Sequence, residues 1–323
     1  MKIKEYLLSL LFLTSLSYSQ SLYKENTKIN DSVDYFLEVA IFNKDDKKSF
    51  NKAIIYSEKA IEYAKENNLN EKLGDCYLVL GSVHFDLNKT DNAIENFIRS
   101  INHYNKKEKS TNLALAYYNL GNCYLIKNKT DLSEIYFNKS AQLYKQFNFS
   151  DAIDLINLQK GIIEKKKNNF SDAELIFKKI IIDVVNEDFV DTKVEAFFQL
   201  GQIAFIKKDT DKSIQYFETA LKTNRAGNRN NSLEIKTLKE LSKVYKSINK
   251  FEKANFYLEE YATILDSIGS NFNNLISENT FDEIKFDKQL QTIEQLDKEK
   301  KSQQRTLRFS KLISILSIAL ISI

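Results

Sequence analysis

The chain has 323 residues, of which 43% are hydrophobic and 28% are charged, and its formal net charge at pH 7 is +3. This near balance of charge argues against a nucleic-acid-binding protein, because such proteins concentrate basic charge. The sequence contains seven glycines and no proline. With so few residues that break helices, the composition favours an all-helical protein over a sheet protein.

The N-terminus has the three-part pattern of an export signal. Two lysines precede an apolar run at residues 7–16, and Ser17 and Ser19 place small side chains before a cleavage point ahead of Gln20. The run is shorter than the roughly 20 apolar residues that span a bilayer. We therefore expect residues 1–19 to be a signal peptide and the mature protein to be exported. The alternative is a buried first helix, which would leave a cytosolic adaptor.

A pattern with a 40-residue period occupies the middle of the chain. Its fixed points are a glycine, a small residue twelve positions later and a phenylalanine four positions after that. The glycines are Gly81, Gly121, Gly161 and Gly201, the small residues are Ala93, Ser133, Ala173 and Ser213, and the phenylalanines are Phe97, Phe137, Phe177 and Phe217. A looser version continues on both flanks, so about six units are expected.

Each unit is predicted to be a pair of helices, A and B, joined by a polar turn. The glycine on helix A and the small residue on helix B let the two backbones approach closely. The phenylalanine is expected to fill the space between one pair and the next. Apolar residues before each glycine recur at helical spacing and indicate a buried stripe. Hydroxyl residues in the turns are expected to cap the B helices, namely Thr90, Thr130, Ser171 and Thr210.

The pattern resembles the tetratricopeptide repeat, in which Leu-Gly, an aromatic residue, Ala, Phe and Ala stand at set offsets. Two units carry it as Leu80, Gly81, His84, Ala93, Phe97 and Ser100, and as Leu120, Gly121, Tyr124, Ser133, Phe137 and Ser140. The usual period of that family is about 34 residues, so the longer period here implies longer helix pairs. The third unit departs most, because Asn157, Lys160 and Glu164 stand at apolar positions, and its helix A is expected to pack differently.

The resemblance implies an all-α, superhelical solenoid of about six helix pairs over residues 20–268. A single pair cannot bury its apolar face, whereas stacked pairs share a continuous core. After the solenoid, residues 269–308 are highly charged, with sparse apolar residues at helical spacing, which predicts a linker helix. This helix either forms a coiled-coil homodimer or is solitary and solvated.

The segment at residues 309–323 is apolar and carries no charge from Leu312 onward. Because a spanning helix needs about 20 apolar residues, we expect a truncated transmembrane segment here. The alternatives are a tail that dips into a membrane and a tail that packs on the solenoid. Lysines and arginines precede this segment, which opposes the positive-inside tendency if the repeats are exported.

Residues that could carry catalysis are sparse. Cys76 and Cys123 fall on neighbouring A helices with an axial offset of about 10 Å, which exceeds the reach of a disulfide, so both are expected to be structural. His84 occupies the aromatic position of its unit and is expected to pack there. The sequence lacks zinc-ligand spacings, phosphate-binding glycine loops and nucleophilic serine motifs. We therefore expect no enzymatic activity, cofactor or metal in this chain.

Binding is the function that the pattern favours. The resemblance implies a groove lined by helix A residues on the inner wall of the solenoid. The corresponding candidates are Leu78, Ser82, Phe85, Tyr118, Asn122, Leu125, Phe198, Gln202, Phe205, Lys239, Lys243 and Lys246. Such a groove would hold a protein or peptide ligand, with aromatic residues for apolar side chains and lysines for an acidic group. The alternative is that the aromatic residues pack between repeats and the lysines form a solvated face.

The order of the predicted parts resembles the extracytoplasmic sensor half of bacterial signalling proteins. In these proteins, a helical linker connects the tetratricopeptide repeats to a histidine kinase or a helix-turn-helix regulator. The resemblance implies a peptide-binding module of a membrane-anchored signalling protein, without its output domain in this chain. The repeats would be periplasmic and anchored in the inner membrane. The alternative is a non-enzymatic envelope scaffold or adaptor that mediates protein–protein interactions.

Overall fold

The computed structural model describes residues 32–45, 49–104, 110–184, 190–227 and 229–267. The predicted signal peptide (1–19), linker helix (269–308) and terminal apolar segment (309–323) lie outside these residues. Within the described ranges all regular secondary structure is helical, which confirms the predicted all-α fold. None of the described helices is both long and apolar enough to cross a membrane.

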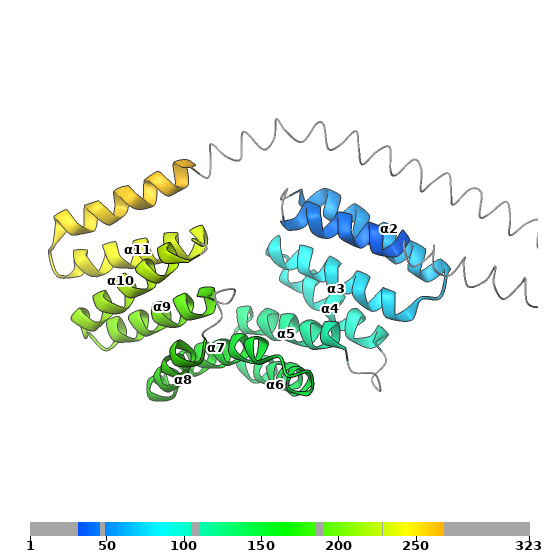
Figure 1. Ribbon diagram of the computed structural model, residues 1–323, viewed down its shortest axis with the longest axis horizontal. Coiled ribbons are helices and arrows are strands. Elements are labelled where there is room, and N and C mark those ends of the chain that lie inside the picture. Colours follow the sequence, from blue (N-terminus) through cyan, green and yellow to red (C-terminus); the bar gives the residue numbers. More distant parts are fainter. Residues whose placement is uncertain (1–31, 46–48, 105–109, 185–189, 228, 268–323) are drawn as a thin grey trace, which may run out of the picture. The chain divides into compact units, whose positions relative to one another are not determined.

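The helices follow one another in chain order (Figure 1). The A helices are α3 (Asn70–Asp86), α5 (Thr111–Ile126), α7 (Ser150–Lys166), α9 (Val190–Ile206) and α11 (Asn231–Ser247). The B helices are α2 (Phe50–Glu66), α4 (Thr90–His103), α6 (Thr130–Gln146), α8 (Phe170–Asp183) and α10 (Thr210–Ala226). Residues 32–45 and 251–267 are also helical, and with α2 and α11 they complete six pairs in the described chain.

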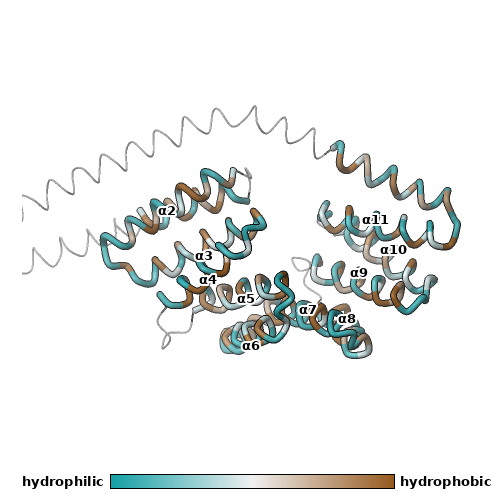
Figure 2. Tube along the Cα trace, turned by 180° about the vertical axis from the view of Figure 1, so that it is seen from behind, coloured by the Kyte–Doolittle hydropathy of each residue, from teal (hydrophilic) through white to brown (hydrophobic). Residues whose placement is uncertain are grey.

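Contacts in this series run between neighbours. Each helix packs against the helices before and after it, and consecutive A helices from α3 to α11 also contact one another. Hydrophilic and hydrophobic residues alternate along the helices (Figure 2), as expected where each helix buries one face. Each pair therefore shares its core with the adjacent pairs, which is the packing of a repeat solenoid.

The 40-residue period follows from the lengths of the helices and turns. Helices α6 and α7 have 17 residues each, and three-residue turns follow both of them. Together these four segments fill residues 130–169, which is one full period. The helices are thus longer than a period of about 34 residues would allow, as the sequence predicts.

The four glycines of the pattern are positions of close approach within a helix pair. A Cβ atom added to any of these glycines would lie 2.6–2.7 Å from the phenylalanine ring of the same pair. The four phenylalanines are fully buried. Each ring therefore fills the space that a side chain on helix A would need. The prediction that it fills the space between successive pairs is therefore incomplete, although Phe97 does share a cluster with Leu120 of the next pair.

The small residues on the B helices add hydrogen bonds to this packing. The hydroxyl groups of Ser133 and Ser213 donate to the carbonyl oxygens of Gly121 and Gly201, at 2.8 and 2.9 Å. Both serines are fully buried. Each of these two glycines thus permits close packing and also accepts a buried hydroxyl.

The turns between helices use asparagine in the left-handed region of the backbone. Asn68, Asn88, Asn128, Asn148, Asn168, Lys208 and Asn249 have φ between 56° and 64°. After Asn88, the backbone N–H of Lys89 donates to the carbonyl oxygen of His84 at 2.9 Å. The corresponding bond spans the same five residues in the other turns, which is the closing bond of a Schellman motif. None of the described glycines has positive φ.

The predicted N-caps are wrong by one or two residues. Thr90, Thr130 and Thr210 are the first residues of their helices, and Ser171 is the second residue of α8. The cap positions belong to Lys89, Lys129, Asn169 and Asp209, and of these side chains only Asp209 accepts a backbone bond, from Lys212 N. The reason is the length of the turn, which closes after three residues and starts helix B earlier.

The third unit keeps the contact between glycine and phenylalanine of the others, but its helix A buries fewer residues than α5 or α9, which agrees with the prediction that this helix packs differently. An added Cβ on Gly161 would meet the Phe177 ring at 2.6 Å, as in the other pairs. Ile156, Leu158 and Ile163 are buried on the same helix. Asn157, Lys160 and Glu164 are only half-buried, because they lie beside this apolar stripe.

Candidate binding site on helices α7, α9 and α11

Three of the predicted groove residues lie in the core. Leu78, Leu125 and Phe198 are 6–7% exposed and belong to apolar clusters shared between helices. Leu78 packs in the cluster of Phe97, and Leu125 packs in that of Phe137. Their side chains face the next helix pair and not an open surface. These three positions are therefore corrected from groove to core.

The half-buried candidates on α3 do not join a polar site. Phe85 packs against the cluster that contains Phe97. The Ser82 hydroxyl donates to the carbonyl oxygen of Leu78 on its own helix, at 3.0 Å. Both side chains thus have partners that any repeat helix offers, and we assign them a packing role.

Helices α7 and α9 meet through a polar network. The amino group of Lys165 on α7 donates to the side-chain oxygens of Gln199 and Gln202 on α9, at 2.6 Å for Gln202. The amide group of Gln199 in turn donates to Glu195 Oε1 at 2.7 Å. Burial lowers the pKa of Lys165, and the charge of Glu195 opposes that shift. The lysine is therefore a partly desolvated cation whose direct hydrogen-bond partners are neutral amides.

Lys165 is also exceptional within the repeat. The equivalent positions, four residues after each glycine, hold Phe85, Leu125 and Phe205 in the other pairs. A lysine is expensive at a position that the fold fills with apolar side chains. Positions where a sequence departs from its own local rule are often functional. This comparison makes Lys165 the strongest candidate on the A helices.

Helix α11 joins the same area through a cation–π contact. The Lys243 amino group lies 5.3 Å from the centre of the Phe205 ring on α9, and it lies 3.4 Å from Glu240 Oε2. Lys239 and Lys246 are exposed on α11 and form no ion pair within the described ranges. The structure thus brings Gln202, Phe205 and Lys243 together, as predicted residues of one site.

A second polar group involves α5 and α7. Burial raises the pKa of Tyr118, and hydrogen bonds with Asn122 and Gln159 oppose that shift. The Tyr118 ring lies 5.7 Å from the Phe137 ring, measured between centres. Tyr118 and Asn122 are therefore held together at the edge of the core, where the Tyr118 hydroxyl is already engaged.

Sequence reasoning missed Lys165, Gln199 and Glu195. A signal was present, because Glu195, Gln199 and Gln202 follow one another at spacings of four and three residues, which places them on one helix face. A comparison of position 165 with the equivalent residues Phe85, Leu125 and Phe205 would have identified Lys165. We call Lys165, Gln199, Gln202, Phe205 and Lys243 the α7–α11 site.

The nucleophilic and metal-binding residue types lie apart from this site. Cys76 and Cys123 are buried and free, and burial raises the pKa of each thiol to about 12. His84 Nδ1 lies 3.0 Å from the carbonyl oxygen of Leu80 on its own helix. Among the described residues, no group of three or more His, Cys, Asp or Glu side chains could hold a metal ion.

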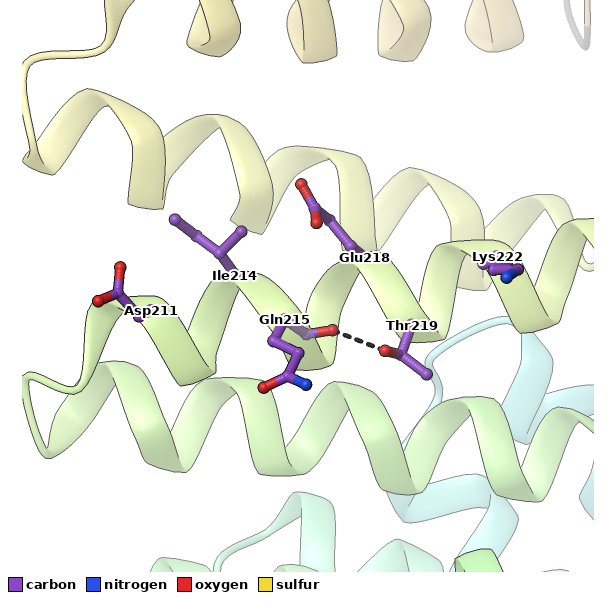
Figure 3. A pocket seen from close by; sticks show the side chains of 6 residues that line it. All are labelled: Asp211, Ile214, Gln215, Glu218, Thr219 and Lys222. Carbon is purple, nitrogen blue, oxygen red and sulfur yellow. Dashed lines mark hydrogen bonds between the residues drawn. The ribbon is translucent and has the colours of Figure 1, made fainter.

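A hollow of about 420 Å³ lies along α10 (Figure 3). Its lining comes from this one helix and consists of Asp211, Ile214, Gln215, Glu218, Thr219 and Lys222. Glu218 Oε1 accepts hydrogen bonds from the hydroxyls of Tyr245 and Tyr257, at 2.9 and 3.2 Å. The Thr219 hydroxyl donates to the carbonyl oxygen of Gln215 at 2.7 Å. These polar groups are already engaged, so the hollow offers a ligand little beyond exposed surface.

Comparisons with known proteins identify the class of fold. A family model of the tetratricopeptide repeat matches residues 75–146, and a second one matches residues 194–226. These segments correspond to most of α3–α6 and α9–α10. The chain therefore carries tetratricopeptide repeats, as its pattern predicts. No curated protein matches the sequence.

Solved structures agree with that class. BtubC (BKLC) from P. vanneervenii is 16% identical, with a TM-score of 0.54, over 68% of this chain and 92% of that chain. The apo form of RapI is 14% identical, with a TM-score of 0.59, over 74% and 85%. PilW, a type IV pilus biogenesis factor, is 17% identical, with a TM-score of 0.52, over 71% and 91%. At such low identity the likeness establishes a tetratricopeptide-like helical fold.

Proposed function

We propose that the repeats form a protein-interaction module that binds an acidic peptide segment at the α7–α11 site. The observation that carries this proposal is the placement of Lys165. Its amino group is held between α7 and α9 by the amides of Gln199 and Gln202. A carboxylate of a ligand would form a charge-assisted hydrogen bond with it, which is stronger than a bond to a neutral amide.

The neighbours of Lys165 suit the rest of a peptide. The exposed lysines of α11 add positive charge, and the Phe205 ring offers an apolar contact beneath Lys243. The side-chain amide of Gln202 carries a donor and an acceptor that match a peptide backbone, whereas Gln199 is buried and holds Lys165 in place. Peptide recognition in general combines an anchor in a groove with charge recognition of acidic motifs. The chemistry of the site thus favours an acidic segment with an apolar side chain next to the acid.

The proposal for the whole protein rests on the order of parts in the sequence. A signal pattern, a repeat solenoid, a charged segment and an apolar run are together typical of a membrane-anchored bacterial sensor without enzymatic activity of its own. We place the repeats in the periplasm on that basis. An envelope scaffold is the alternative. Mass spectrometry of the mature N-terminus tests the export, and an in-frame output domain downstream of the codon for Ile323 would favour the sensor.

The binding proposal is tested with an array of synthetic peptides of equal length and graded net charge. We expect the full chain to select acidic peptides that also carry an apolar residue. Lys165→Met should weaken binding of the selected peptides by about ten- to hundredfold, because a charged hydrogen bond is worth roughly 1.5–3 kcal/mol. Lys222→Met, an exposed lysine on the B helix α10, is the matched control and should bind as the parent chain does. Selection without acidic bias, or equal binding by Lys165→Met, would contradict the proposal.

A further inference from the structure

The B helices carry an outer stripe that differs between repeats. Four outward positions recur on α4, α6, α8 and α10 with the 40-residue period, and all of them are exposed except Thr219, which is half-buried. On α6 they hold Leu132, Ile135, Lys139 and Gln142, and on α8 they hold Asp172, Leu175, Lys179 and Ile182. On α4 the same positions hold Asn92, Glu95, Arg99 and Asn102, and on α10 they hold Lys212, Gln215, Thr219 and Lys222. The fold therefore accepts polar residues there, and from α4 to α10 apolar residues occupy these positions only on α6 and α8, while α2 carries Ile55 at one of them.

The apolar side chains of this stripe are open to solvent. Leu175 and Ile182 are 69% and 75% exposed, and Ile135 is 49% exposed. Helices α6 and α8 both pack on α7, which lies between them (Figures 1 and 2). Equivalent positions on successive repeats face the same side of a solenoid. Leu132, Ile135, Leu175 and Ile182, with the charges beside them, therefore form one surface, which we call the α6–α8 outer face. Exposed apolar clusters of this kind mark interaction sites.

The charges on this face are arranged symmetrically about the apolar residues. On α6, Asp131 and Lys139 lie four residues before and four residues after Ile135. On α8, Asp172 and Lys178 lie three residues before and three residues after Leu175, and Lys179 follows. All of these charged side chains are exposed. On both helices an acidic residue thus comes first, an apolar residue follows, and basic residues come last. The central residues, Ile135 and Leu175, occupy the same position of the repeat.

We infer that a second copy of this chain covers the α6–α8 outer face, with α8 of one copy antiparallel to α8 of the other. A twofold axis that crosses α6 at Ile135 and α8 at Leu175 sets each of these residues against its own counterpart. The same rotation places Asp172 opposite the lysines 178 and 179 of the second copy, and Asp131 opposite lysine 139. Such a surface is complementary to itself, which is the requirement for an isologous dimer interface.

A cysteine at the centre of the interface gives a direct test in the full chain. Leu175→Cys would place two thiols opposite each other, so mild oxidation should give a covalent dimer that a reductant reverses. The native Cys76 and Cys123 are buried, so they do not compete for the oxidant. Gln215→Cys occupies the same repeat position on α10 and is the matched control, which should stay monomeric. Equal cross-linking by both variants, or by neither, would overturn the inference.

Charge reversal separates this interface from any other association. In the Leu175→Cys background, Asp172→Lys should lower cross-linking at limiting concentration about tenfold, which corresponds to about 1.4 kcal/mol. The added change of both Lys178 and Lys179 to Asp restores opposite charges across the axis and should restore the dimer. Circular dichroism confirms that each variant folds. If the extent of cross-linking did not change in these charge variants, the assignment would be contradicted. Cross-linking to a different protein in place of a second copy would contradict it as well.

Discussion

Helices α5 and α7 occupy the same place in successive repeats, yet they differ in what they bury. Helix α5 buries seven residues, including Leu120, Cys123 and Leu125. Helix α7 buries four, namely Ile156, Leu158, Gly161 and Ile163. At the position of Leu125, α7 carries Lys165, which reaches to α9. The two helices nevertheless make the same contact between glycine and phenylalanine with their B helices.

The difference shows how few positions the fold requires. A glycine on helix A and a buried phenylalanine on helix B set the packing of a pair, and an asparagine in the turn sets its chain reversal. The remaining positions of helix A are then free to vary, because stacked neighbours supply most of the core. Function can therefore reside on α7 without loss of the solenoid. The measurements below would break or sharpen this comparison.

The largest effect is expected from the phenylalanines. Phe137→Ala, in the pair of α5, and Phe177→Ala, in the pair of α7, should each lower the free energy of unfolding by about 3–5 kcal/mol. Both rings are fully buried and lie against a glycine. Urea unfolding followed by circular dichroism measures both values. A much smaller loss for Phe177→Ala would mean that the polar composition of α7 has loosened its pair.

The glycines should show the next largest effect. In an open helix, glycine to alanine stabilises by roughly 1 kcal/mol, but an added Cβ on Gly121 or Gly161 would lie within 2.7 Å of a ring. Gly121→Ala and Gly161→Ala should therefore each lower the free energy of unfolding by about 1–3 kcal/mol through overpacking. Combining Gly161→Ala with Phe177→Leu should cost less than the sum of the single changes. Additive losses would contradict the proposed clash.

Replacement of Lys165 by an apolar residue should raise stability and abolish binding. Lys165→Leu restores the apolar residue that α5 has at this position and should raise the free energy of unfolding by about 1 kcal/mol, as other repairs of functional positions do. It should also abolish selection of acidic peptides. Thermal melts and the peptide array measure the two effects on the same samples. A variant that is less stable than the parent would show that the lysine is structural.

The pH dependence of this variant sharpens the same point. Burial lowers the pKa of Lys165 in the folded state, so the unfolded chain binds more protons at pH values between the folded and unfolded pKa. Stability of the parent chain should therefore rise with pH across that alkaline window. Lys165→Leu should lack this component of the rise, and a difference curve between the two proteins measures it. If the stability of both proteins changed with pH in the same way, Lys165 would not be desolvated in the folded chain.

Most of the fold could be predicted from the sequence because its signals are periodic. The glycines and phenylalanines repeat at 40 residues, and a core must repeat with them. The predicted caps failed because each turn closes after three residues, so that helix B begins at or before the threonine or serine that was expected to cap it. Asn68, Asn88, Asn128, Asn148 and Asn168 are spaced in multiples of 20 residues, a signal that a search for the 40-residue unit alone did not use.

The site was harder to predict because its residues come from different repeats. Gln202, Phe205 and Lys243 were found from their expected place on helix A. Leu78, Leu125 and Phe198 were assigned to the groove because helical spacing gives the face of a helix but not which neighbour covers it. The contact of Lys165 with Gln199 depends on how α7 sits on α9, and only the packed structure supplies that information.

The smallest effect concerns a turn that lacks asparagine. Of the seven three-residue turns in the part of the chain that the structure describes, only the one between α9 and α10 has another residue, Lys208, in the left-handed region, with φ of 62°. Asparagine tolerates that region better than other residues with a Cβ atom. Lys208→Asn should therefore raise the free energy of unfolding by about 0.5–1 kcal/mol, and Asn88→Lys should lower it by a similar amount in the turn between α3 and α4. Urea unfolding of both variants gives a reciprocal test, because each introduces the residue that the other removes. If Lys208→Asn brought no gain while Asn88→Lys destabilised, the value of asparagine would lie in contacts of its side chain and not in the backbone of the turn.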